Sequence, residues 1–487
     1  IIKKTDGAAS WMVWHRSLNN TTTDSLYLDA TNEPTTNTNY WNSTAPTSTT
    51  LTLGSHFNLN HSGATYVGYF FAHDTSDEGI IQCGSFTPDG SGDVSINLGF
   101  EPQFIIMKQI SGYPASWYMF DTLRGMNRDH RENFYPNLNN AADISTTGST
   151  TFESSIFPTA TGFEIKSGFG NETFVYMAIR RGLMGIPTTR TSVFAVEALS
   201  GASGTRNYTT NFPVDMIMNP NTSGGSDHIP VIDRLRGTSE TRPEWVSTNN
   251  NYGRDHPTSS SYGWGFDKST GYTSKDIWVA DQYGYAWRRA PGFFDMVVYT
   301  GNATNRTINH NLGVAPEFMV LKTTVTLADW AIYHGDATNY MEFNTNIAST
   351  DDQTYWNDTA PTDTVFTVGT ANTVNPNNEP VVAYLFATLA GISKVGTFSH
   401  TNGSSTDVNC GFSSGSSFVI AKRTDSTGDW YLWDSARGIN SGNDAYFLMN
   451  TTDAEVTNTD FIDPLNSGFQ IASGFTTGTY FFYAIAA

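Results

Sequence analysis

An Asp followed three residues later by an Arg recurs in this sequence and is its most chemically suggestive pattern. A carboxylate and a guanidinium at that spacing could clamp a pair of sugar hydroxyls through charge-assisted hydrogen bonds. The same two groups could instead form a local ion pair that fixes the loop after a strand. Because the pattern recurs within one scaffold, we predict the structural role. The pairs are Asp121 with Arg124, Asp233 with Arg236, and Asp434 with Arg437.

Two equivalent places in the chain lack this pair. One reads Trp-His-Arg-Ser at 14–17, and the other reads Tyr-His-Gly-Asp at 333–336. A binding site that every copy needs is therefore not expected at this position.

Aromatic side chains are the second source of candidate sites, with 12 Trp and 23 Tyr in the chain. Exposed aromatic faces stack on sugar rings while nearby polar groups bind the hydroxyls. Four tryptophans stand at equivalent places and are predicted to pack in cores or between modules: Trp11, Trp117, Trp330 and Trp430. Loop aromatics without counterparts are the better ligand candidates, namely Tyr113, Trp245, Tyr252, Tyr262 and Trp264.

Two acidic loops, residues 87–93 and 424–429, carry oxygen ligands of the kind that Ca²⁺ prefers. Neither contains a complete calcium-loop pattern with its distal Glu, and both also have the composition of hairpin turns. We therefore predict turns and no cofactor, with Ca²⁺ as the alternative. No catalytic residue is assigned, because nothing singles out a carboxylate pair and no helix follows a nucleophile pattern. The chain is predicted not to be an enzyme.

The elements that must position these residues belong to a repeated module. The phrase that begins at Trp41, WNSTAPTSTTLTLGS, returns at Trp356 as WNDTAPTDTVFTVGT, with most positions identical. The two copies lie 315 residues apart (356 − 41), which is about three domain lengths. The chain is thus predicted to be a tandem array of one domain.

Three further phrases recur and have the character of strands. The first is a buried apolar run that ends in a Lys, where we expect the chain to return to solvent: 98–108, 312–322 and 410–422. The second alternates large aromatic residues with others: 116–125, 329–336 and 429–438. The third closes the module: 66–72, 174–179, 381–387 and 480–486.

These phrases divide the chain into five modules: a truncated module 1 at 1–76, module 2 at 79–181, a divergent module 3 at 183–289, module 4 at 292–389 and module 5 at 391–487. The opening residues 1–7 align with 419–425, so the sequence is expected to begin inside a strand of a longer protein. The joints are only a few residues long, which favours neighbours packed end to end. Module 3 is interpreted either as a module specialised for recognition or, as we favour, as an oligomer contact.

Turn signals recur every eight to twelve residues, which is typical of β-sandwiches. The predicted fold is all-β, a tandem array of antiparallel sandwiches of jelly-roll or concanavalin-like type with almost no helix. The best helical stretch, residues 141–145, is too short to be stable alone.

The composition excludes several partners. Lys plus Arg number 26 against 46 Asp plus Glu, a net charge of −20, so nucleic acid and anionic membrane surfaces would be repelled. The absence of a long apolar run argues against membrane insertion. The only cysteines, Cys83 and Cys410, fall in different modules, which excludes a disulfide framework.

The combination of these phrases resembles a repeat module of tail-fibre and virion-appendage proteins of tailed phages, especially the marine, cyanophage type. The quoted segments LGFEPQFIIMK, DWYLWDSARG, WNSTAPTSTTLTLG and YVGYFFAH carry the resemblance. It implies a component of the virion surface, or an extracellular one, that contacts other virion proteins and a host-surface glycan or receptor. By analogy with fibres it also implies a homo-oligomer, with a trimer favoured. It supplies no catalytic or ligand residues.

Two other functions remain open at this point. The array could be a cellular surface adhesin or carbohydrate-binding array. It could also be the accessory-module region of a polysaccharide-degrading enzyme, which would need a carboxylate groove in module 3.

Overall fold

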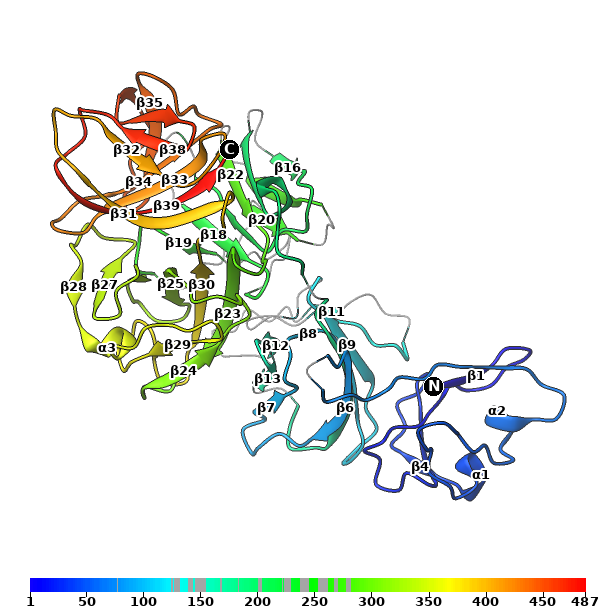
Figure 1. Ribbon diagram of the computed structural model, residues 1–487. Coiled ribbons are helices and arrows are strands. Elements are labelled where there is room, and N and C mark those ends of the chain that lie inside the picture. Colours follow the sequence, from blue (N-terminus) through cyan, green and yellow to red (C-terminus); the bar gives the residue numbers. More distant parts are fainter. Residues whose placement is uncertain are drawn as a thin grey trace. The chain divides into compact units, whose positions relative to one another are not determined.

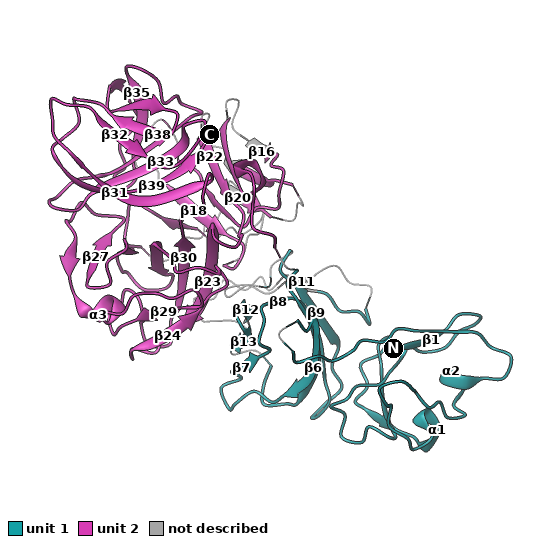
Figure 2. Cartoon of the chain, viewed as in Figure 1, with its two compact units in different colours: residues 1–182 teal, residues 183–487 magenta. Residues whose placement is uncertain are grey.

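The structure, a computed structural model, describes residues 1–76, 78–123, 126, 132–138, 143–144, 155–166, 169–182, 184–199, 204–220, 222, 229–236, 245–252, 262–266, 270–276 and 282–487. The chain divides into two compact units (Figure 2). Unit 1 comprises residues 1–182 and unit 2 comprises residues 183–487. Modules 1 and 2 therefore form unit 1, and modules 3, 4 and 5 form unit 2.

The chain is all-β and its ladders are antiparallel, which confirms the predicted fold class. In the described part of the chain, no helix is long and apolar enough to cross a membrane. Each sheet is built from strands of one module, and apolar side chains from its inner face form that module's core.

Module 5 shows the complete architecture (Figure 1). A small sheet packs on the inner face of a large one. Trp433, Phe469 and Phe482 belong to the core and are 0%, 0% and 2% exposed. The large sheet has the order β31 (Ser393–His400), β39 (Gly478–Ala486), β33 (Ser416–Arg423), β34 (Trp430–Asp434), β35 (Asp444–Leu448) and β36 (Val456–Thr459). The small sheet has the order β32 (Thr406–Asn409), β38 (Gly468–Ile471) and β37 (Ile462–Leu465).

Module 4 repeats this order. Its large sheet runs β23 (Phe294–Thr300), β30 (Pro380–Phe386), β25 (Phe318–Thr323), β26 (Ala331–Tyr333), β27 (Asn339–Glu342) and β28 (Thr350–Asp351), and its small sheet pairs β24 (Arg306–Asn309) with β29 (Val365–Val368).

Module 3 keeps the same order although its sequence diverges. Its large sheet runs β15 (Phe194–Leu199), β22 (Gln282–Trp287), β17 (Met216–Met218), β18 (Pro230–Asp233) and β19 (Val246–Ser247). Its small sheet runs β16 (Gly204–Tyr208), β21 (Tyr272–Asp276) and β20 (Tyr262–Gly265). The short 3-10 helix η1 (Arg190–Ser192) precedes β15.

In unit 1, the large sheet of module 2 has the order β6 (Ile81–Phe86), β14 (Phe174–Arg180), β8 (Pro102–Gln109) and β9 (Trp117–Asp121). Its small sheet has the order β12 (Ser155–Thr159), β13 (Gly162–Lys166) and β7 (Val94–Asn97). A separate pair consists of β10 (Glu132–Asn133) and β11 (Asp143–Ile144). The stretch 141–145, for which no stable helix is predicted, lies outside the described residues except for Asp143–Ile144, which form β11. Module 1 has a single sheet of β4 (Thr35–Thr36), β3 (Asp24–Tyr27), β2 (Met12–Val13), β1 (Ile2–Lys4) and β5 (Tyr66–Gly68).

The register of β1 differs from the predicted alignment by one residue. Lys3 pairs with Val67, just as Lys422 pairs with Phe481, the matching residue of the closing strand in module 5. Lys3, and not Lys4, is therefore the equivalent of Lys422. The sequence alignment matched Lys4 with Lys422 because two lysines, Lys3 and Lys4, are adjacent in the sequence.

The duplicated Trp-Asn motif ends a one-turn helix in each of its two copies. Trp41 and Trp356 end the one-turn helices α1 (Thr38–Trp41) and α3 (Gln353–Trp356), and the Asn that follows each has a left-handed backbone. Both indoles are buried and donate to a backbone carbonyl of the large sheet, at Asp24 and Asn339 respectively. A third one-turn helix, α2 (Phe57–Asn60), lies in module 1. Asn tolerates the left-handed conformation better than most residues, which explains its place in the phrase.

The joints within unit 2 are tight turns. Ala290 bridges to Phe294 before module 4, and Leu389 bridges to Ser393 before module 5. Each turn contains a glycine with positive φ, 75° at Gly292 and 74° at Gly391. Turns this short fix each closing strand relative to the first strand of the next module.

We expect Gly391→Ala to lower the free energy of unfolding of unit 2 by about 1–2 kcal/mol, because an L residue is strained at this φ. No atom lies within 4 Å of the added methyl group, so backbone strain alone is measured. Urea unfolding followed by tryptophan fluorescence reports the change. Gly182→Ala is the matched control, since Gly182 is equally open and has no left-handed φ. An equal effect of both changes would contradict this explanation.

Candidate functional site at the module interfaces

The Asp434–Arg437 pair closes the turn after β34. Its side chains are 0% and 1% exposed, and Arg437 Nε lies 2.6 Å from Asp434 Oδ2. The backbone N–H groups of Ala436 and Arg437 donate to Asp434 Oδ1 at 2.8 and 3.0 Å. These bonds give the pair the local role that the sequence predicts, because they fix the loop after the strand.

A tyrosine from another module completes each buried pair. The Tyr285 hydroxyl of module 3 donates to Asp434 Oδ2 of module 5 at 2.6 Å. In the same way, the Tyr384 hydroxyl of module 4 donates to Asp233 Oδ2 of module 3 at 2.6 Å. Burial raises the pKa of both tyrosines well above the ordinary range, so both hydroxyls stay protonated and donate.

We call each set of three residues a clamp. The first clamp contains Asp233, Arg236 and Tyr384, and the second contains Asp434, Arg437 and Tyr285. In both clamps the Arg also contacts the tyrosine hydroxyl, at 3.0 and 3.3 Å, so no charge is buried without a partner.

The third interface of unit 2 has no clamp. His334 of module 4 stands at the position that Asp434 has in module 5, and its ring contacts Phe481 and the Ser349 hydroxyl. Among the described residues, no hydrogen-bond acceptor receives the buried hydroxyl of Tyr483, the residue equivalent to Tyr285 and Tyr384. Burial lowers the pKa of His334, so its ring is neutral near pH 7.

Tryptophans at one repeated position also join the modules. The indole N–H of Trp330 donates to the Ser247 carbonyl of module 3 at 2.8 Å, and that of Trp430 donates to the Glu342 carbonyl of module 4 at 2.7 Å. In unit 1 the indole of Trp117 donates to the Tyr27 carbonyl of module 1 at 2.8 Å. The predicted intermodule packing is therefore present for these three residues.

The lysine that ends each buried strand does not return to solvent, so that part of the prediction is wrong. Lys108, Lys322 and Lys422 are each 0% exposed. Their ammonium groups instead bind carbonyls in a loop of the preceding module. Lys322 reaches the Asn251 carbonyl at 3.1 Å, and Lys422 reaches the Ile347 carbonyl at 2.8 Å. Lys108 reaches the Thr31 carbonyl at 3.3 Å.

The buried lysines make stability depend on pH. Burial lowers the pKa of Lys322 to about 7, whereas an unfolded Lys keeps its proton up to about pH 10.4. Between these values the unfolded chain binds more protons, so the free energy of unfolding rises as pH rises from about 7 to about 10. We expect the rise between about pH 7 and pH 9 to be smaller in Lys322→Met than in the parent chain. Urea unfolding at both pH values measures it, and equal rises in the two proteins would contradict the assignment.

The three large sheets of unit 2 meet around one small apolar cavity of about 40 Å³. Equivalent residues of the three modules line it: Met216, Phe318 and Phe418 in one set, and Met218, Val320 and Ile420 in another. Contacts link module 3 to module 4, module 4 to module 5, and module 5 back to module 3. Unit 2 is thus a closed ring of three modules. Its centre is lined by apolar side chains from all three modules.

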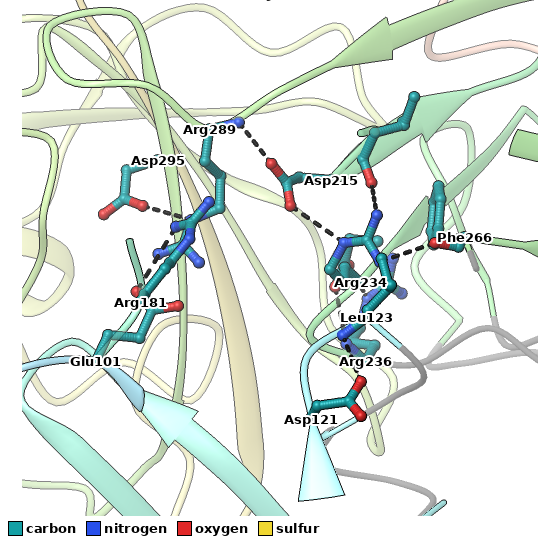
Figure 3. A network of polar contacts seen from close by, with 12 residues as sticks. Glu101, Asp121, Leu123, Arg181, Asp215, Arg234, Arg236, Phe266, Arg289 and Asp295 are labelled. Carbon is teal, nitrogen blue, oxygen red and sulfur yellow. Dashed lines mark hydrogen bonds and ion pairs between the residues drawn. The ribbon is translucent and has the colours of Figure 1, made fainter. Parts of the chain in front are cut away.

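A second buried ionic network holds the joint between modules 3 and 4 (Figure 3). Arg289 Nε lies 2.7 Å from Asp295 Oδ1, and the Arg289 backbone N–H donates to Asp215 Oδ2 at 2.8 Å. The other oxygen of Asp215 binds Arg234 Nε at 3.2 Å. The network ties β17 and the loop after β18 to the first strand of module 4.

The predicted ligand aromatics fall into two groups. Tyr113 and Tyr252 are 59% and 58% exposed, as a sugar platform requires. Trp245 and Trp264 are only 8% and 2% exposed, so the prediction that they face a ligand is corrected by their burial. Their rings pack edge to face at 5.4 Å in the core of module 3. The side chain of Tyr262 lies outside the described residues, although its backbone belongs to β20.

The Asp–Arg pair of module 2 can be followed only in part. Asp121 ends β9, and its Oδ1 accepts the Leu123 N–H at 3.1 Å. Arg124 lies outside the described residues.

The acidic loop 87–93 forms a turn, in which Asp89 Oδ1 accepts the N–H groups of Ser91 and Asp93 at 2.8 and 3.0 Å. The acidic loop 424–429 connects the paired strands β33 and β34, and Asp425 pairs with Arg423 at 2.6 Å. No group of three His, Cys, Asp or Glu side chains within the described residues is arranged to hold a metal ion.

The clamp tyrosines are the residues that sequence reasoning missed. Tyr285 is the fourth residue of the closing segment 282–287, and Tyr384 is the fourth of 381–386. A Tyr also stands fourth in modules 1 and 5, at Tyr69 and Tyr483, whereas module 2 has Met177 there. That recurring register was a usable signal, but hydroxyl partners about 150 residues away leave no local trace.

Comparison with known proteins places the chain in a family without giving it a function. Searches of curated proteins and of solved structures each found no match. One family model matches residues 1–181 and 288–487, which is most of the chain. The unmatched segment falls in module 3, where the repeated phrases are weakest. The chain therefore belongs to the family described as Domain of unknown function (DUF7483).

Proposed function

We propose that this chain is a non-enzymatic structural and adhesive component of a phage virion, a tail or head fibre that presents β-sandwich modules for attachment to a host surface. The observation that carries the proposal is the use of the repeated polar motif. Both fully described Asp–Arg pairs bind a neighbouring module and not a cavity. Side chains committed to holding modules together suit a structural part better than a catalytic one.

The packing also suits a part that must transmit force and resist unfolding. Each interface buries aromatic rings, and two interfaces contain a clamp. Short joints, bridged at Ala290 with Phe294 and at Leu389 with Ser393, leave little freedom between modules 3, 4 and 5. The net charge of −20 favours solubility without nucleic acid as a partner.

The adhesive part of the proposal rests on residues that differ between the modules. Tyr113 and Tyr252 lie on loops, are more than half exposed, and have no counterpart in the other repeats. A ring in that situation can stack on a sugar while neighbouring amides and hydroxyls bind its hydroxyl groups. A host-surface glycan is therefore the proposed ligand, and other virion proteins and further copies of the chain are the proposed partners.

The virion location is tested with antibodies raised against the purified chain. We expect gold-labelled antibodies to mark an appendage on particles of the phage whose genome encodes the chain. Peptides of the chain should also be found in washed particles by mass spectrometry. Particles that lack the chain, together with labelling of a cell envelope, would favour a cellular adhesin and overturn the proposal.

The adhesive role is tested separately on a glycan array. We expect the chain to bind a defined glycan class and Tyr113→Ala or Tyr252→Ala to weaken that binding about tenfold or more, because each stacked ring contributes more than 1 kcal/mol. Phe57→Ala is the control, since Phe57 is also exposed, at 47%, but lies outside these loops. Equal binding by all three variants would restrict the proposal to a structural role.

A further inference from the structure

Exposed apolar side chains gather at the interface between modules 3 and 4. Tyr252 of module 3 is 58% exposed, and Val325 and Leu327 of module 4 are 39% and 68% exposed. Within the described residues of unit 2, the other large apolar side chains that are exposed are Ile186 and Val314, and they lie on neither of these two loops. We call Tyr252, Val325 and Leu327 the interface patch.

One backbone carbonyl holds the two loops of the patch together. The Asn251 carbonyl of module 3 accepts the Ala328 N–H at 3.0 Å and the Lys322 ammonium at 3.1 Å, both from module 4. Tyr252 directly follows Asn251, and Leu327 directly precedes Ala328, so standard bond lengths place the Cα atoms of Tyr252 and Leu327 within about 8 Å of each other. The patch is therefore built by two modules, and its loops are fixed before a ligand binds, which lowers the cost of binding.

The interface between modules 4 and 5 repeats the backbone contact without the apolar side chains. There the Gly428 N–H donates to the Asn346 carbonyl at 3.0 Å. Thr427 stands at the place that Leu327 has in module 4. The backbone contact thus belongs to the common scaffold, whereas the apolar side chains on it are specific to the interface of modules 3 and 4.

Polar groups beside the patch suit a neutral ligand that carries hydroxyls. Glu379 Oε2 accepts the hydroxyl of Thr326, the residue before Leu327, at 2.8 Å. A carboxylate accepts up to about four hydrogen bonds, so a ligand hydroxyl can be added there. The two loop segments, 245–252 and 323–329, contain no Lys or Arg. An anionic ligand is therefore disfavoured at this place.

We propose that the interface patch binds a neutral sugar that carries a methyl group, of which a 6-deoxyhexose is the simplest class; this inference rests on the proposed adhesive function. The sugar ring stacks on Tyr252, its methyl group packs on Leu327 and Val325, and Glu379 accepts one of its hydroxyls. An ordinary hexose would place a hydroxymethyl group against the same aliphatic side chains and leave its hydroxyl without a partner.

The size of the patch favours a sugar over a protein partner. A stable protein interface uses roughly 20–30 residues on each side. Three apolar side chains instead match the face of one sugar ring together with its methyl group. A contact between copies of the chain is therefore the alternative that the experiment must distinguish.

Two matched pairs of methyl glycosides test the proposed ligand class. Methyl α-L-fucoside and methyl α-L-rhamnoside carry a methyl group at carbon 6, whereas methyl α-L-galactoside and methyl α-L-mannoside carry a hydroxymethyl group there. In titrations of the full chain followed by NMR, we expect the 6-deoxy sugar of at least one pair to bind about fourfold more tightly than its partner, the effect of burying one methyl group. Saturation transfer from the protein should be strongest at that methyl group.

Variants of the patch locate the binding. Leu327→Ala should reduce the ratio of affinities within the pair to about one, and Tyr252→Ala should weaken both sugars about tenfold or more. Thr427→Ala is the matched control, because Thr427 is exposed at the same loop position of module 5 and should change neither affinity. The three replaced side chains are exposed, so each variant should keep the urea midpoint of the parent chain.

Three results would overturn the inference. The first is equal affinity within both pairs, or no binding of any of the four sugars. The second is a ratio that Leu327→Ala leaves unchanged. The third is dissociation of an oligomer by Leu327→Ala in analytical ultracentrifugation with sugar binding unchanged, since the patch would then be a contact between copies. The adhesive role fails separately, because glycan binding through Tyr113 would sustain it even where the patch binds no sugar.

Discussion

Asp434→Asn is expected to lower the free energy of unfolding of unit 2 by about 3–5 kcal/mol, the usual effect of removing one partner of a buried ion pair. The change leaves the guanidinium of Arg437, which is 1% exposed, without its counter-charge. It also removes the charged acceptor of the Tyr285 hydroxyl and so weakens the contact between modules 3 and 5. Urea unfolding at about pH 7, followed by tryptophan fluorescence, measures the change.

Two further variants distinguish the effect of the buried clamp from the effect of removing any carboxylate charge. Asp425→Asn removes an exposed partner of Arg423 and should change stability by at most about 1 kcal/mol. Replacing the clamp as a pair, with Asp434→Leu and Arg437→Met, should cost much less than Asp434→Asn because no charge stays buried alone. If Asp434→Asn costs no more than Asp425→Asn, the clamp does not stabilise the fold.

Trp430→Ala is expected to have an effect of similar size, about 3–5 kcal/mol, as large-to-small changes of buried tryptophans do. The ring is 0% exposed and packs on Phe343 of module 4 at 4.9 Å, so its loss opens a cavity at the interface. The Glu342 carbonyl also loses its donor. Urea unfolding again provides the measurement.

Trp430→Phe distinguishes the two parts of that effect. Phe keeps most of the packing but cannot donate, so the expected cost is about 1–3 kcal/mol for an unsatisfied buried carbonyl. A cost below about 1 kcal/mol for Trp430→Ala itself would place the ring on the surface and contradict the observed interface.

The strands were predictable because their signals are local. Apolar runs such as Phe318–Thr323 and closing phrases such as Pro380–Phe386 are dense in β-branched and aromatic residues, which favour strands wherever they occur. The one-turn helices at the Trp-Asn phrase were not predicted, because four residues give no helical periodicity.

The burial of Lys322 could not be predicted from the residues near it in the sequence. A Lys after an apolar run ordinarily marks the surface, and here a loop of another module supplies the carbonyls that replace water. Which module supplies that loop depends on tertiary packing. Strands with apolar residues on both faces indicate that something packs on the second face, but they do not identify which module does so. The closed ring of modules 3 to 5 was therefore not predictable.

Only the exposed fraction of each side chain distinguishes the candidate ligand residues that can face a ligand from those that cannot. Tyr113 and Trp264 have equally suggestive places in the sequence, yet one side chain is 59% exposed and the other 2%. Trp264 packs in the apolar core of module 3, and its buried indole N–H donates to Asn219 there. Sequence divergence in that module therefore changes its core as well as its surface, and divergence alone does not identify a binding site.

The central claim is that unit 2 is a ring closed by contacts between residues far apart in the chain. A double-mutant cycle on Tyr285→Phe and Asp434→Asn tests it most directly, because these residues are 149 positions apart and share one hydrogen bond. We predict a coupling free energy of about 1–3 kcal/mol between the two changes in urea unfolding. Effects that add within about 0.5 kcal/mol would contradict the ring, since independent sites behave in that way.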